Sequence, residues 1–133
     1  MANDLVFLSG QLLREARTGA NIGSAPEWGN IHSSELNSDE ARKAFWLNVY
    51  NAYVLLVMKA QPDLLVKHRT AFFTQPRIAV GGLHLSFDDV EHGILRKGAW
   101  KYGLGYVRNP WVKPAIKRWM LHKMDSRIHF ALN

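Results

Sequence analysis

The stretch FWLNVYNAYVLLVM, residues 45–58, decides the fold of this chain. Its apolar side chains recur at helical spacing, and further leucines fill the other sides of the helix. A helix that is apolar nearly all round lies inside a core and not on a surface. The run of 14 residues is too short, and with two asparagines too polar, to span a bilayer. We therefore predict a buried central helix around which the other elements pack.

Local signals mark both ends of this helix. Asn37 is a residue type that caps helix N-termini, and Glu40 stands where a capping box places its acid. Pro62 has no backbone N–H and a fixed φ angle, so it ends the helix on the C-terminal side. We expect the helix to begin after Asn37 and to end before Pro62.

Further short elements are predicted on either side. Gly81 and Gly82 stand between two apolar segments, which is typical of a β-hairpin with a two-residue turn. His84 alternates with apolar neighbours and should point to the opposite face of its strand. Ser86 is a strong N-cap with Asp89 three residues later, so a helix should follow it. The other expected elements are helices at 4–18, 87–96 and 110–124, a helical turn at 62–69 and a strand at 127–132.

Together these elements predict an α+β fold, a mostly helical single domain over residues 1–133. A short β-hairpin and a C-terminal strand surround the buried central helix in this prediction. A chain of 133 residues is long enough for one hydrophobic core. Its composition, 47% apolar and 21% charged, is that of a globular protein and argues against disorder.

Two absences restrict the function classes. The sequence contains no cysteine, which excludes disulfides, thiol nucleophiles and thiolate metal sites within these residues. The N-terminal residues carry no basic leader and only a short apolar run, so we expect no signal peptide and a cytoplasmic protein.

The net charge of +6 is unevenly distributed. Between Arg96 and Arg127 there are nine Lys/Arg residues and one acid, which gives this segment a net charge of +8. The remainder of the chain has eight basic and ten acidic residues and a net charge of −2. Such a basic segment either forms a solvated helix face or attracts an anionic ligand or protein partner. Aromatic residues accompany the cations, but the segment has no nucleic-acid-binding motif, so we do not expect nucleic acid as the partner.

Three separated segments together resemble the family catalogued as domain of unknown function 547. They are AFWLNVYNA at 44–52, LSFDDVEHGILR at 85–96 and DSRIHFALN at 125–133, and the resemblance covers about residues 38–133. In the family, the last segment leads into a Cys-Gly-Ala-x-Ser-Cys-Pro-like stretch, whereas this sequence stops at Asn133. We therefore expect a truncated domain. An unpaired edge of its last strand would favour self-association.

Glu91 and His92 are the first candidate catalytic residues. Adjacent residues on an α-helix diverge by about 100°, so we expect their side chains not to face each other. His92 shares a helix face with Asp88 and Arg96, and Asp88 could hold one ring nitrogen while the other transfers a proton. The alternative is a structural role, either as a helix-surface pair or as a contact between the helix and the strand beneath it.

His129 is the second candidate, on the expected C-terminal strand. The resemblance implies that a cysteine follows it, after four intervening residues, in complete relatives, where a Cys–His pair would suggest a thiol hydrolase. Asn48 or Asn51 would then supply an oxyanion-stabilising amide. The alternative for both asparagines is hydrogen bonding to nearby backbone, because a buried unpaired amide costs about 1–3 kcal/mol. The other expected binding residues are Arg96 and Arg127.

We predict no metal site and no cofactor. His84, His92, His129 and Glu91 contain ligand atoms but have no recognisable ligand spacing such as HExxH. Two functional hypotheses remain: an enzyme-like polar cleft, inactive in this cysteine-free chain, or a non-enzymatic module that binds an anionic partner through its basic segment.

The basic segment can be tested directly. If the +8 charge between residues 96 and 127 forms a binding surface, the chain should bind heparin at 50 mM salt and lose affinity steeply by 200 mM, because binding releases counterions. Fluorescence anisotropy with labelled heparin measures this. Affinity that does not depend on salt would contradict the prediction.

Overall fold

The computed structural model describes residues 2–18, 31, 33–36, 38–95 and 119. This part of the chain is mostly helical and contains one small antiparallel sheet, which confirms the predicted mostly helical α+β fold. None of the described helices is both long and apolar enough to cross a membrane. The elements in chain order are α1 (Ala2–Thr18), η1 (Ser33–Glu35), α2 (Asp39–Ala60), α3 (Leu64–Lys67), α4 (Arg69–Thr74), β1 (Ile78–Val80), β2 (Leu83–Leu85) and η2 (Asp89–Leu95).

Helix α2 is the predicted central helix. Phe45, Trp46 and Val49 have no exposed surface, and Tyr50 has almost none. Burial ends in the last turn, where Met58 is 39% exposed. The prediction of a buried central helix is therefore confirmed for most of its length.

The N-cap of α2 is Ser38, so the prediction of Asn37 is wrong by one residue. Ser38 has an extended backbone, and its hydroxyl oxygen accepts a hydrogen bond of 3.1 Å from the Ala41 N–H. Both residue types are good caps, and Ser38 is the one whose hydroxyl reaches a first-turn amide. The opposite end is as predicted, since Gln61 caps the helix immediately before Pro62.

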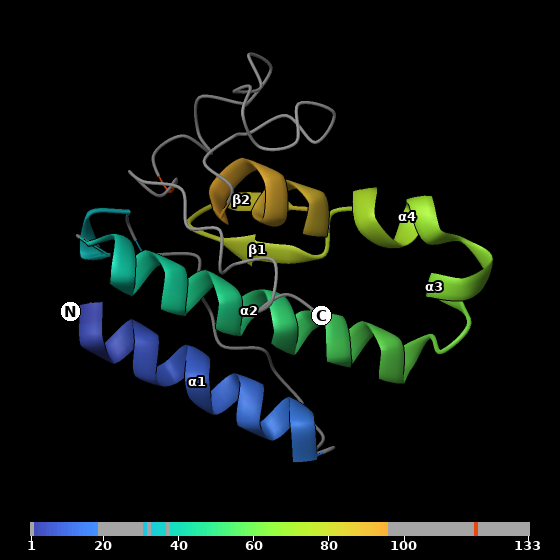
Figure 1. Cartoon of the computed structure of the whole chain (residues 1–133), viewed down its shortest axis with the longest axis horizontal. Helices are drawn as coiled ribbons and strands as arrows, with labels where there is room; N and C mark the ends of the chain where they lie inside the picture. Colours follow the sequence, from blue (N-terminus) through green and yellow to red (C-terminus); the bar gives the residue numbers. More distant parts are fainter. Residues whose placement is uncertain (1, 19–30, 32, 37, 96–118, 120–133) are drawn as a thin grey trace.

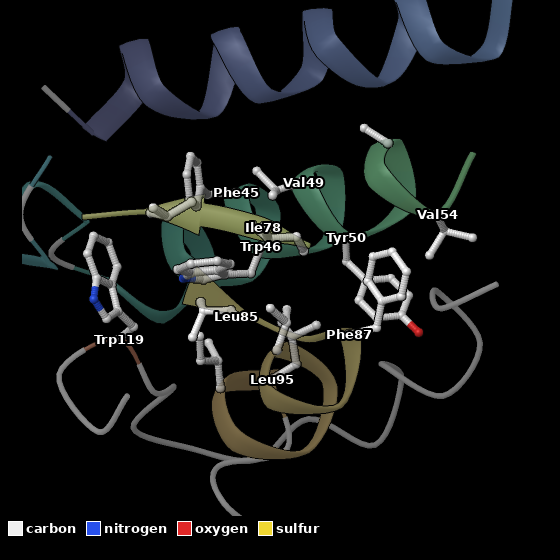
Figure 2. Close-up of a cluster of buried hydrophobic side chains, with 14 of the residues drawn as sticks. Phe45, Trp46, Val49, Tyr50, Val54, Ile78, Leu85, Phe87, Leu95 and Trp119 are labelled. Atoms are coloured by element: carbon white, nitrogen blue, oxygen red, sulfur yellow. The ribbon is translucent and has the colours of Figure 1, made fainter. Parts of the chain in front are cut away.

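Other elements cover α2 on different sides (Figure 1). Helix α1 lies along one side and contributes the buried leucines Leu5, Leu12 and Leu13. The β-hairpin lies on another side, and η2 packs against α2 there. Figure 2 shows side chains from α2, the hairpin and the η2 segment meeting in one apolar cluster, which Trp119 joins.

The hairpin confirms the predicted two-residue turn. Gly81 and Gly82 have φ angles of 58° and 79°, which glycine adopts without strain. Strands β1 and β2 pair Ile78 with Leu85 and Val80 with Leu83. His84 is exposed between Leu83 and the buried Leu85, as the alternation predicts.

Helix α4 was not predicted, because only a turn was expected at residues 62–69. Its six residues are held partly by a side chain that lies just beyond its C-terminal end. The Arg77 guanidinium donates to the carbonyl oxygens of Phe72 and Ala71, at 3.0 and 3.2 Å, and so caps the C-terminal end of α4. The expected helix at 110–124 and the expected strand at 127–132 lie outside the described residues.

The two turn glycines form a matched pair for testing the hairpin. A Cβ at Gly81 would lie 2.7 Å from the Trp119 ring and 3.0 Å from the Ile31 carbonyl oxygen, whereas a Cβ at Gly82 would meet nothing within 4 Å. Gly82→Ala should cost about 1–2 kcal/mol from its backbone angle alone. Gly81→Ala should cost more, because the Trp119 ring must also shift. Urea unfolding of both variants measures the difference in stability. Equal losses of stability would contradict the packing of Trp119 against Gly81.

Candidate functional site

A pocket of about 360 Å³ lies between α4 and η2. One wall carries a cation, two hydroxyls and an aromatic ring, whereas the other carries two carboxylates and an imidazole. The lining residues are Arg69, Thr70, Phe73 and Thr74 from α4, with Asp88, Glu91 and His92 from the opposite wall.

Ser86 fixes the start of the helix that bears the acidic wall. Its hydroxyl oxygen accepts from the Asp89 N–H at 3.0 Å, and its own N–H donates to the Asp89 carboxylate at 3.0 Å. These reciprocal bonds form a capping box and confirm the predicted N-cap. They hold the first helical turn, which contains Asp88, directly after β2.

The helix continues as a π-helix from Asp89 to Leu95. A π-turn closes its hydrogen bonds between residues five apart instead of four, so successive side chains are distributed around a wider turn. His92 Nε2 lies 3.9 Å from Asp88 Oδ1 and also 3.9 Å from Glu91 Oε2. The expectation that Glu91 and His92 do not face each other is therefore wrong, while Asp88 and His92 share a face as their spacing predicts.

This carboxylate–imidazole triplet, Asp88, Glu91 and His92, is partly buried. Its side chains are 34%, 17% and 24% exposed, respectively. The Tyr50 hydroxyl lies 3.5 Å from Glu91 Oε2, at the long limit of a hydrogen bond. Because Tyr50 is buried in α2, this contact ties the acidic wall to the central helix.

Ligand atoms from all three residues of the triplet lie within 4.8 Å of one another. Such a set can exchange a proton with a bound molecule or coordinate a cation. On the opposite wall, the Arg69 guanidinium lies over the Phe73 ring, 5.2 Å from its centroid. The pocket therefore presents negative and positive groups on facing walls.

The asparagines predicted to line the site lie elsewhere on α2. Asn48 donates its side-chain amide to the Ser9 hydroxyl of α1 at 3.2 Å. It precedes Tyr50 by two positions, about 200° around the helix, so its side chain points away from the acidic wall. Asn51 is buried in α2. His84, considered as a metal ligand, is exposed on β2 and is not part of the triplet.

Three predicted site residues lie outside the described residues. These are Arg96, Arg127 and His129. Asp88 was considered only as a partner for His92, and its grouping with Glu91 was missed. The signal in the sequence was the i, i+3 spacing of Asp88 and Glu91, which places these two side chains on one face of a helix.

One family matches the chain. It is described as "Protein of unknown function, DUF547", and it matches residues 33–133, about three quarters of the sequence. The match includes α2, the hairpin and the pocket, and it leaves out α1. No curated protein and no solved structure matches the chain.

The Asn48–Ser9 contact gives a test of a structural role for Asn48. Asn48→Ala and Ser9→Ala should each lower the free energy of unfolding. The double variant should lose less stability than the two single variants lose together, and the difference, a coupling energy of about 0.5–1.5 kcal/mol, comes from the shared hydrogen bond. Urea denaturation of the four proteins measures this. Strict additivity would show that the contact contributes nothing to α1–α2 packing.

Proposed function

The chain belongs to the DUF547 family, and from that premise we propose that the pocket between α4 and η2 is an enzyme-like cleft. In this cleft a small polar substrate is hydrolysed by water that the carboxylate–imidazole triplet activates. The observation that carries the proposal is the position of His92, 3.9 Å from two carboxylates on a pocket wall. Carboxylates and imidazoles are the groups that most often transfer protons in enzymes.

Water is the proposed nucleophile because these residues include no thiol. Its oxygen bonds to the electrophilic atom of the substrate as one O–H bond breaks, and the proton passes to the triplet. The bond to the leaving group then breaks, and the triplet returns the proton to that group. This proposal replaces the thiol chemistry that the resemblance implies for complete relatives, and it gives Glu91 and His92 a function without a cysteine.

The facing wall supports an anionic substrate. Arg69 lines the pocket, and its guanidinium can bind a carboxylate or phosphate through paired hydrogen bonds. The Thr70 hydroxyl adds a further hydrogen-bonding group on this wall, whereas the Thr74 hydroxyl already donates to the Thr70 carbonyl oxygen at 2.7 Å. Arg96, Arg127 and His129 remain predicted members of the same cleft from the family pattern.

The roles of Glu91 and His92 can be separated from folding. Wild-type protein should hydrolyse at least one member of a panel of anionic esters, amides and phosphomonoesters. His92→Gln and Glu91→Gln should each lower kcat/KM by about 100-fold or more, the scale of general acid–base catalysis. Arg69→Gln should raise KM for anionic substrates with little change in kcat. Product formation by mass spectrometry measures all three effects.

His84→Gln is the matched control, because His84 is an exposed histidine outside the pocket. It should keep wild-type activity, and melting temperatures should show that every variant is folded. Activity that survives in both His92→Gln and Glu91→Gln would refute the assignment, as would a wild-type protein with no activity on the panel.

A further inference from the structure

We propose that Asp88, Glu91 and His92 bind a divalent transition-metal cation, Zn²⁺ in particular, whose free coordination positions open into the pocket. The inference rests on the proposed function and deepens it: the cation would lower the pKa of the water, and a carboxylate oxygen of Asp88 or Glu91 that does not ligate the cation would take the proton. A bound Zn²⁺ lowers the pKa of a coordinated water to about 7, which supplies hydroxide at neutral pH.

The donor atoms suit such a cation. The site offers one imidazole nitrogen and two carboxylates, and the two His92–carboxylate separations are 3.9 Å. Tetrahedral Zn²⁺ with bonds of about 2.0–2.2 Å holds its ligands roughly 3.4 Å apart. The two His92–carboxylate separations must therefore shorten by about half an ångström, and the Asp88–Glu91 separation, which is within 4.8 Å, by at most about 1.4 Å. The partial exposure of the three side chains leaves them room to do so.

The backbone arranges these ligands in advance. Metal sites on helices use ligands three and four residues apart, and Asp88, Glu91 and His92 stand at i, i+3 and i+4. The capping box at Ser86 fixes the first turn, and the wider winding from Asp89 onward brings Glu91 beside His92. π-turns inside helices frequently occur at functional sites, which accords with this placement.

A buried group behind the ligands and an open space in front of them complete the site. The Tyr50 hydroxyl lies 3.5 Å from Glu91, so it can orient that carboxylate from within the core. The pocket of about 360 Å³ leaves room for water and substrate at the remaining coordination positions. Arg69 on the opposite wall can hold the anionic part of a substrate near the cation.

The ligand set also selects the type of cation. Ca²⁺ and Mg²⁺ prefer sites made of oxygen atoms, whereas an imidazole nitrogen favours Zn²⁺ and its neighbours. Three protein ligands with an open position are the arrangement of catalytic zinc sites, while structural zinc sites use four.

Calorimetry on the metal-free chain tests this inference without any substrate. Zn²⁺ titrated into wild-type protein should bind at one strong site, and Asp88→Asn, Glu91→Gln and His92→Gln should each weaken that site at least about tenfold. Tyr50→Phe, which keeps the buried ring, should weaken it about tenfold, as outer-shell changes do. His84→Gln and Asp63→Asn, an exposed histidine and an exposed acid, should not change the affinity.

Parallel titrations with Mg²⁺ and Ca²⁺ test the selectivity, and both ions should bind more weakly than Zn²⁺. Three results would overturn the inference: no strong Zn²⁺ site in the wild-type protein, Zn²⁺ affinity in the three ligand variants equal to that of the wild type, or tighter binding of Ca²⁺ than of Zn²⁺. Hydrolysis by metal-free protein at the full rate would overturn it as well but leave the proposed function standing. If Zn²⁺ binding depends on the triplet but the protein hydrolyses no member of the panel, the metal site stands and the proposed function is refuted.

Discussion

The packing of the Phe87 ring is the interaction on which both walls of the pocket depend. Its centroid lies 5.4 Å from Tyr50 of α2, 5.1 Å from Phe72 and 6.5 Å from Phe73 of α4. Aromatic pairs at such separations add about 0.5–1.5 kcal/mol each beyond the area they bury. Because Phe87 immediately precedes Asp88, the same ring holds the acidic wall against the central helix and beside α4. The position of the polar pocket is thus set by an apolar cluster beneath it.

Most of the fold could be predicted where the signals are local. The apolar run of α2, the paired glycines of the hairpin and the Ser86 cap each act within a few residues, and α2, the hairpin and the helix after Ser86 follow from them. Helix α4 could not be predicted, because Arg77 and the ring of Phe87 support it from outside. The Ser38 cap was missed by one residue, since two neighbouring residue types compete for that position and the backbone decides between them.

The site was harder to predict than the fold. The Asp88–His92 relation follows from helical spacing, but the approach of Glu91 to His92 depends on a π-helical winding, for which the sequence of 89–95 carries no distinct signal. Asn48 was predicted to supply an oxyanion-stabilising amide in the cleft, yet it bonds to Ser9, 39 residues earlier. Such a pairing depends on which helix covers which side of α2, and that is a property of the assembled core.

The contact between Trp119 and Gly81 bears on the order in which the chain assembles. The hairpin pairs residues only a few positions apart and can form within about 1–10 μs. Trp119 meets Trp46, 73 positions away in the sequence, with ring centroids 5.5 Å apart, and closing so long a loop carries a larger entropic penalty. Since Gly81 has no side chain where the indole ring rests, the turn can be complete before that ring arrives. We therefore expect Trp119 to dock onto the core late in folding, after the hairpin has formed.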